Sequence, residues 1–127
     1  MVNNFSSNTP EIKLIESTVD NYFYGMHNGN VDRLRSAFHS QAHLSGYRNN
    51  KFIVLPLESW LSKVVERSAP SANGEAFEMS IESVKISKSV GTVIVKNLYM
   101  GLQFTDHLSI AKIDDKWLIM HKSFHHN

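Results

Sequence analysis

The sequence predicts an α+β fold, in which three helices from the N-terminal half cover one face of a curved, mixed or antiparallel sheet. Two observations lead to this class. Apolar residues recur at helical spacing in three segments of the first half, whereas the second half is rich in β-branched and aromatic residues separated by turn signals. Helices with one apolar stripe bury it by packing together on a face of such a sheet.

Length and composition restrict the kind of protein this is. A chain of 127 residues suits one domain, here 1–127, with residues 1–8 expected to be a flexible lead-in. The net charge of +1 gives no reason to expect nucleic acid as a partner, and no apolar run reaches the roughly 20 residues that span a membrane. Cysteine is absent, which excludes disulfides and thiolate catalysis and agrees with a cytoplasmic location.

The first two helices are expected at residues 9–29 and 31–38. Pro10 suits the first turn of a helix, Gly29 suits a helix end, and Asn30 can cap the second helix. The buried stripe of the first helix is expected to consist of Ile12, Ile15, Val19, Tyr22 and Met26.

A hairpin and a third helix are expected next. Asn49 and Asn50 tolerate the positive φ angles of a tight turn between two strands within residues 42–55. Pro56 ends the second strand. Helical spacing then returns, with a predicted buried stripe of Leu57, Leu61, Val64 and Val65.

The remaining chain is expected to form a meander of four strands. In residues 77–87 the apolar alternation changes phase, which predicts a bulge near Glu82 and Ser83. Turns are expected at Gly91, near Gly101 and at Asp114–Asp115.

Counting residues from these turns predicts which side chains share a face of the sheet. With turns at Gly101–Leu102 and Asp114–Asp115, Asn97 lies opposite Asp106 and Leu108 lies opposite His121. This face is mostly apolar and aromatic and suits the floor of a small-molecule pocket. The opposite face would carry a row of Lys96, His107 and Lys122.

Asp106 and His121 are the candidate catalytic residues, because as diagonal neighbours an acid and a histidine can transfer a proton. Asp106 alone could also act as acid or base, or it could simply bond backbone at the rim. His39 suits either a helix C-terminus or a contact with a ligand at the rim. The candidate ligand-binding residues are Tyr22, His39, Tyr47, Asn97, Tyr99 and Ser123. Phosphate-loop, dinucleotide and zinc-helix motifs are not found, so neither a cofactor nor a metal is expected.

Two stretches resemble a known family. "YFYGMHNGNVDRLRSAFHSQAHL" and "FTDHLSIAKIDDKWLIMHKSF" are similar to the first two helices and the closing hairpin of the nuclear transport factor 2-like superfamily. The nearest branches are the putative lumazine-binding group and the SnoaL-like polyketide cyclases. The resemblance implies a cone-shaped sheet with the helices on its concave face, a pocket between them, and a homodimer formed through the sheet.

Three functional hypotheses follow from these features. The first is a binding protein for a small hydrophobic or aromatic molecule. The second is a cofactor-independent isomerase, dehydratase or cyclase that uses Asp106 and His121 as acid and base. The third is a dimeric interaction module whose sheet surface, with Lys96, His107 and Lys122 near the contact, is its function. We expect the first.

Overall fold

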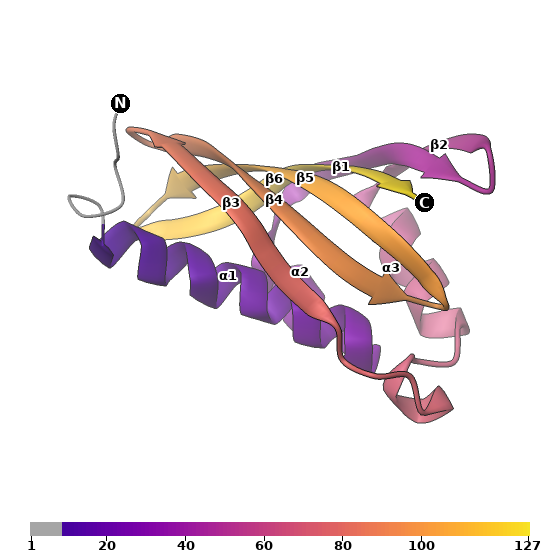
Figure 1. Cartoon of the computed structure of the whole chain (residues 1–127). Helices are drawn as coiled ribbons and strands as arrows, with labels where there is room; N and C mark the ends of the chain where they lie inside the picture. Colours follow the sequence, from indigo (N-terminus) through magenta and orange to yellow (C-terminus); the bar gives the residue numbers. More distant parts are fainter. Residues whose placement is uncertain (1–8) are drawn as a thin grey trace.

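The computed structural model describes residues 9–127, and the expected lead-in at residues 1–8 lies outside them. The helices and strands follow the predicted order (Figure 1). Their bounds are α1 Thr9–Asn28, α2 Val31–Ala37, β1 Phe38–Arg48, β2 Lys51–Pro56, α3 Leu57–Glu66, the short 3₁₀ helix η1 Ser71–Asn73, β3 Met79–Ser87, β4 Val90–Tyr99, β5 Leu102–Ile113 and β6 Lys116–His126. The predicted α+β class is confirmed.

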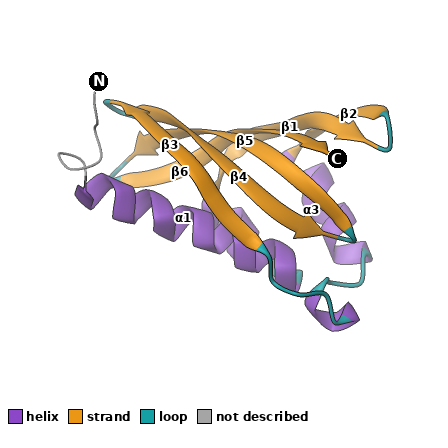
Figure 2. Ribbon diagram, in the orientation of Figure 1, coloured by secondary structure: helices purple, strands orange, loops and turns teal. Residues whose placement is uncertain are grey.

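The six strands form one mixed sheet, with the order β2-β1-β6-β5-β4-β3. Only β1 and β6 pair in parallel among the described strands, and this pairing joins the N-terminal hairpin to the C-terminal meander. Figure 2 shows all three helices below the sheet, on its concave side, as predicted. The sheet therefore has one covered face and one outer face.

Helix α1 is held against the sheet by its apolar stripe and by polar contacts near its start. Glu11 accepts hydrogen bonds from Trp117 Nε1 at 2.8 Å and from Lys112 Nζ at 3.0 Å, and both bonds lower the pKa of the carboxyl. Thr18 Oγ1 donates to the carbonyl of Trp117 at 2.6 Å. The fully buried side chains of the stripe are Ile15, Val19, Tyr22 and Met26.

The shorter helices agree with the sequence except at Phe38, which begins β1 instead of ending α2, and at Val65. The side chain of Asn30 accepts a hydrogen bond from Arg33 N at 3.1 Å, which confirms the expected cap of α2. Helix α3 begins directly after Pro56 without a side-chain cap. Val65 was expected on its buried stripe but is 65% exposed, whereas Trp60, which was not expected there, is buried in the core.

Turn chemistry explains most of the strand connections. Asn49 and Asn50 have φ angles of 52° and 65°, and Asp114–Asp115 forms the same kind of turn, as expected. The turn expected at Gly91 is wrong, because the chain already turns at Lys88–Ser89 and Gly91 pairs within β4. A Cβ atom at Gly91 would lie 2.6 Å from the carbonyl oxygen of Lys85, which explains a glycine there.

The turn between β4 and β5 lies at Met100–Gly101, one residue earlier than expected. Tyr99 therefore pairs with Leu102, and Asn97 lies opposite Phe104 instead of Asp106. Because this moves the pairing by two residues, every side chain of β5 keeps its predicted face.

Two bulges interrupt the ladders, and the sequence predicted only one of them. The register between β3 and β4 shifts between Ile81 and Ser83, as the change of phase indicated. In β6, Ile119 pairs with Ile110 while His121 pairs with Ser109, so Met120 is an extra residue.

The bulge at Met120 reverses the predicted faces of the end of β6. Lys122 pairs with Leu108 and lies on the covered face, whereas His121 lies with Ser109 on the outer face. The predicted pairing of Leu108 with His121 is wrong for this reason.

Within residues 9–127, no helix combines the length and the apolar character needed to cross a membrane.

Gly46 tests the close pairing of β1 with β6. It lies opposite Phe124, and a Cβ atom there would overlap the backbone and ring of Phe124. We expect Gly46→Ala to lower the free energy of unfolding by about 1–3 kcal/mol in urea titrations, although alanine normally suits a strand better than glycine. Ser40→Ala, at an exposed position of the same strand, serves as control and should change it by less than about 0.5 kcal/mol. Equal stability of the two variants would contradict the tight approach.

Candidate functional site

A buried polar centre lies where β4, β5, β6 and α1 meet. Asp106 of β5 is 0% exposed, and its Oδ2 accepts hydrogen bonds from Tyr22 Oη and, at 2.6 Å, from Asn97 Nδ2. Lys122 Nζ lies 4.0 Å from the same oxygen. Within residues 9–127, Asp106 Oδ1 and Asn97 Oδ1 have no hydrogen-bond partner. The site therefore holds one carboxylate, one ammonium and two unused acceptors in a setting that excludes most water.

Burial decides the charge states in this centre. The pKa of Tyr22 is raised well above its usual value, first by burial and then by the charge of Asp106, so the phenol stays neutral and donates. Burial lowers the pKa of Lys122 to about 8, with a further contribution from the positive charge of Arg67. The negative charge of Asp106 acts in the opposite direction. The ammonium is thus mainly charged near neutral pH.

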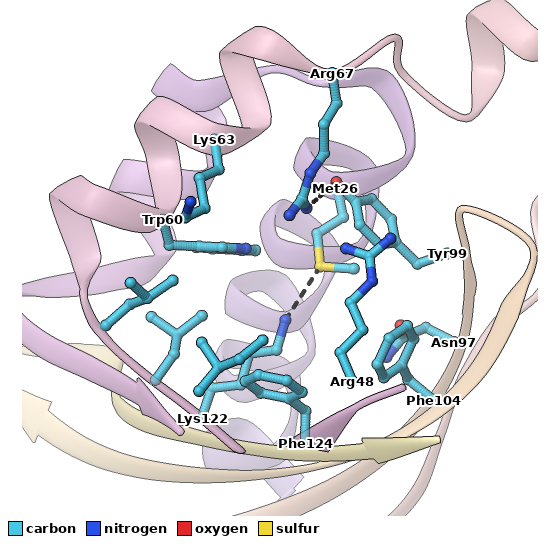
Figure 3. Close-up of a pocket in the computed structure, with 13 residues that line it drawn as sticks. Met26, Arg48, Trp60, Lys63, Arg67, Asn97, Tyr99, Phe104, Lys122 and Phe124 are labelled. Atoms are coloured by element: carbon cyan, nitrogen blue, oxygen red, sulfur yellow. Dashed lines mark hydrogen bonds between the residues drawn. The ribbon is translucent and has the colours of Figure 1, made fainter. Parts of the chain in front are cut away.

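Lys122 lies among aromatic rings. Its Nζ is 4.5 Å from the ring centroid of Trp60, 5.0 Å from that of Tyr22 and 5.6 Å from that of Phe124. Figure 3 shows its hydrogen bond to Met26, in which the sulfur accepts at 3.6 Å. Rings stabilise a buried cation through their negative faces, but a thioether is only a weak acceptor.

Above this centre, a pocket opens between the sheet and α3 (Figure 3). The space inside it, counted together with the solvent at its open side, is about 670 Å³. Most of its lining is apolar or aromatic, and the rest includes four basic residues. The lining residues are Met26, Leu44, Arg48, Ile53, Leu55, Trp60, Lys63, Arg67, Asn97, Tyr99, Phe104, Lys122 and Phe124.

The candidate ligand-binding residues are divided by the structure. Asn97 and Tyr99 lie in the pocket lining, and Tyr22 lies beneath it as a donor to Asp106. The pocket lining does not include His39, whose Nδ1 accepts a hydrogen bond from Gln41 N at 3.1 Å within β1. Tyr47 and Ser123 belong to the outer face, because they alternate with pocket residues along β1 and β6.

The structure does not bring together the candidate catalytic pair, Asp106 and His121. His121 lies on the outer face and is within hydrogen-bond distance of Ser45 Oγ, at 3.1 Å, and of Ser123 Oγ, at 3.3 Å. Lys122, expected on the outer face, lies beside Asp106 instead. The bulge at Met120 exchanges the sheet faces on which His121 and Lys122 lie.

Several pocket residues were missed from the sequence. Trp60, Lys63 and Arg67 are spaced by three and four residues, which places them on one side of α3, and this signal was available. Arg48 shares one face of β1 with Leu44 and Gly46, but no pattern in the sequence distinguishes it as a pocket residue. Within residues 9–127, no group of three His, Asp or Glu side chains could hold a metal ion.

The sequence matches a known protein family. The family model described as putative lumazine-binding matches residues 10–125, which is nearly the whole chain. No curated protein shows significant similarity.

Solved structures of three NTF2-like proteins of unknown function are similar to this fold. The protein from Silicibacter pomeroyi has a TM-score of 0.84 at 19% identity, covering 94% of this chain and 98% of its own. The protein from Shewanella baltica has a TM-score of 0.84 at 22% identity, with coverages of 94% and 95%. For that from Methylobacillus flagellatus the TM-score is 0.83 at 23% identity, with 93% of each chain covered. At these identities the likeness shows the fold alone.

A double-mutant cycle tests the pairing of Asp106 with Lys122. Either Asp106→Asn or Lys122→Met leaves one buried charge without its partner, so each should lower the free energy of unfolding. The double variant should lose less than the sum of the two single losses, by about 1–3 kcal/mol, in urea titrations near neutral pH. Additive losses would mean that the two groups do not stabilise each other.

Proposed function

The chain belongs to the putative lumazine-binding family, within the NTF2-like superfamily, and we propose that it binds a small hydrophobic or aromatic molecule in the pocket between sheet and helices. The observation that carries this proposal is the pocket itself. Four aromatic residues and three aliphatic ones from β1 and β2 surround a small number of polar groups, an arrangement typical of small-molecule sites. The fold alone would not support this, because one fold hosts many functions.

The polar groups suit orientation of a ligand. Asn97 lines the pocket and donates its Nδ2 to Asp106, whereas its Oδ1 is buried and has no partner among the described residues. Leaving a buried acceptor unpaired costs about 1–3 kcal/mol. A ligand with a hydroxyl or N–H group at this point would recover that free energy, so Asn97 is the residue we expect to orient the ligand.

The catalytic alternative, a cofactor-independent isomerase, dehydratase or cyclase, is less well supported. His121 lies on the outer face and Asp106 does not line the pocket, so neither of the two candidate residues would contact a ligand there. Recovery of the natural ligand unchanged after prolonged incubation with the protein would exclude this alternative.

A pair of tryptophan substitutions tests the pocket. Ile53 and Val54 are neighbours on β2, but Ile53 lines the pocket whereas Val54 is 59% exposed on the outer face. We expect Ile53→Trp to fill the pocket and to weaken binding of the neutral fluorescent probe N-phenyl-naphthylamine at least about tenfold, which corresponds to about 1.4 kcal/mol.

Val54→Trp adds the same side chain outside the pocket and is the matched control. It should leave probe affinity unchanged in the same fluorescence titration. If both variants bind the probe as tightly as the unmodified protein, the probe binds elsewhere and the proposed pocket is wrong. If only Ile53→Trp weakens binding, mass spectrometry of extracts from the purified protein is the experiment that would identify the natural ligand.

We also propose that the protein forms a homodimer through the outer face of the sheet. Tyr47, Phe52 and Val54 are 48%, 57% and 59% exposed there, and the rings of Tyr47 and Phe52 lie 5.2 Å apart. Exposed apolar patches of this kind mark protein interfaces.

Light scattering tests this second proposal. The unmodified protein should have the mass of a dimer, and Phe52→Glu should convert it to a monomer because it places a charge in the apolar patch. Leu14→Glu, at a 43% exposed apolar position on α1, is the control and should remain dimeric. A monomeric mass for the unmodified protein at high concentration would rule out the proposal.

A further inference from the structure

The side chains that line the pocket carry a net positive charge. Its lining includes the basic residues Arg48, Lys63, Arg67 and Lys122 and no acidic residue. The only carboxylate close beneath it among residues 9–127 is that of Asp106, 4.0 Å from Lys122 Nζ. Within the same residues, no carboxylate lies within 4.0 Å of Arg48, Lys63 or Arg67. The pocket therefore gathers positive charge that the described protein does not neutralise.

Lys122 is the most buried of these cations. Lys122 is 6% exposed, and the only hydrogen-bond partner of its ammonium group within residues 9–127 is the sulfur of Met26. An ammonium group has three donors, so most of its hydrogen-bonding capacity is unused in a site that excludes most water. Such a group is stabilised when an anion with good geometry enters.

The two arginines approach the same space from different elements. Figure 3 shows Arg67 descending from the end of α3 and Arg48 rising from β1, with Lys122 between them and the sheet. Arg67 is positioned by Tyr99, to whose hydroxyl oxygen its Nη1 donates at 3.3 Å. Its charge also contributes to lowering the pKa of Lys122. Like charges that converge in this way repel each other, and a bound anion would relieve that repulsion.

The uncharged residues of the lining indicate the chemistry of the uncharged part of the ligand. Trp60, Tyr99, Phe104 and Phe124 offer ring faces and edges, which pack well against a flat ligand. Asn97 Oδ1 adds one acceptor for a ligand donor. An apolar planar body with one charged end would satisfy both parts of the pocket.

The position of α3 favours a carboxylate over a phosphate. Trp60 and Lys63 of this helix line the pocket, and Arg67, its C-terminal cap residue, reaches into the same space. A helix C-terminus carries partial negative charge, whereas phosphate sites commonly use helix N-termini. A doubly charged group would be opposed there, and a singly charged carboxylate much less.

We infer that the ligand is an aromatic or similarly planar carboxylic acid, bound as its anion with the carboxylate held among Lys122, Arg67 and Arg48. This rests on the proposed function and narrows it from any hydrophobic or aromatic molecule to a charged class. The Asp106 carboxylate keeps Lys122 in place beneath the anion.

The charge of Lys122 gives the site a pH dependence. The charged or titratable groups facing it are Asp106 from β5, Tyr22 from α1 and Arg67 after α3. Arg48 from β1 and Lys63 from α3 share the pocket lining with it. The pKa of Lys122 is about 8, and that of Tyr22 lies well above 10, so Lys122 loses its proton first as pH rises. Affinity for an acid should therefore fall above about pH 8, and binding near that pH should take up protons.

Matched pairs of probes test the inference by calorimetry. The pairs benzoate with benzamide and naphthoate with naphthamide differ mainly in charge. Naphthyl phosphate, with naphthol as its uncharged parent compound, tests a phosphate on the same ring system. At least one carboxylate should bind the unmodified protein about tenfold or more tighter than its amide, as expected for charge-assisted hydrogen bonds. Arg67→Gln and Arg48→Gln should each weaken the carboxylate about tenfold and leave the amide unchanged.

Lys122→Met should cause the largest loss and abolish the pH dependence. Lys122→Met removes a buried charge, so this variant could fail to fold. In that case Arg48→Gln and Arg67→Gln, at partly exposed positions, still test the inference. Lys51→Gln removes an exposed charge from the same hairpin as Arg48, outside the pocket lining, and is the control that should bind normally.

The outcomes separate this inference from the proposed function. Amides that bind as tightly as their acids would overturn the anionic ligand but leave a small-molecule pocket. Tighter binding of naphthyl phosphate than of naphthoate would overturn the carboxylate class. If no member of any pair binds and the Ile53→Trp titration also shows no pocket, the proposed function and this inference fail together.

Discussion

The packing of α1 against β4, β5 and β6 depends on the contacts of one buried group, the carboxylate of Asp106. Through one oxygen it joins Tyr22 of α1 and Asn97 of β4, and it faces Lys122 of β6. A carboxylate that is 0% exposed needs such partners, because an uncompensated charge in this setting is strongly unfavourable. The same contacts fix how α1 crosses the sheet and which side chains of β6 face the helices.

The pocket is a consequence of this centre. Lys122 is drawn to the covered face by Asp106 and by the surrounding rings, and its ammonium then forms part of the pocket floor. Arg48 and Arg67 add further positive charge from β1 and from the end of α3. The polar centre balances its own charges, whereas the pocket above it contains basic side chains without acidic partners.

Local signals in the sequence accounted for most of the fold. The pair Asn49–Asn50 indicated positive φ angles, Asp114–Asp115 indicated a turn, and Asn30 indicated a helix cap; all were confirmed. The bulge in β3 could be predicted because apolar residues on both sides of it change phase. The bulge in β6 has no such signal, since residues 120–124 mix polar, charged and apolar types without a clear alternation.

The sequence by itself determined the fold class, the order of elements, the main turns and the presence of Asp106, Asn97 and Tyr99 on the covered face. Those properties follow from backbone preferences and from the apolar pattern, which act over a few residues. Tertiary structure alone decided that Lys122, and not His121, meets Asp106, and that Arg48 and Arg67 converge on one pocket. The physical reason is that one extra residue in β6 exchanges the two faces of the strand, and its place is set by partners on β5, α1 and α3 that are distant in the chain.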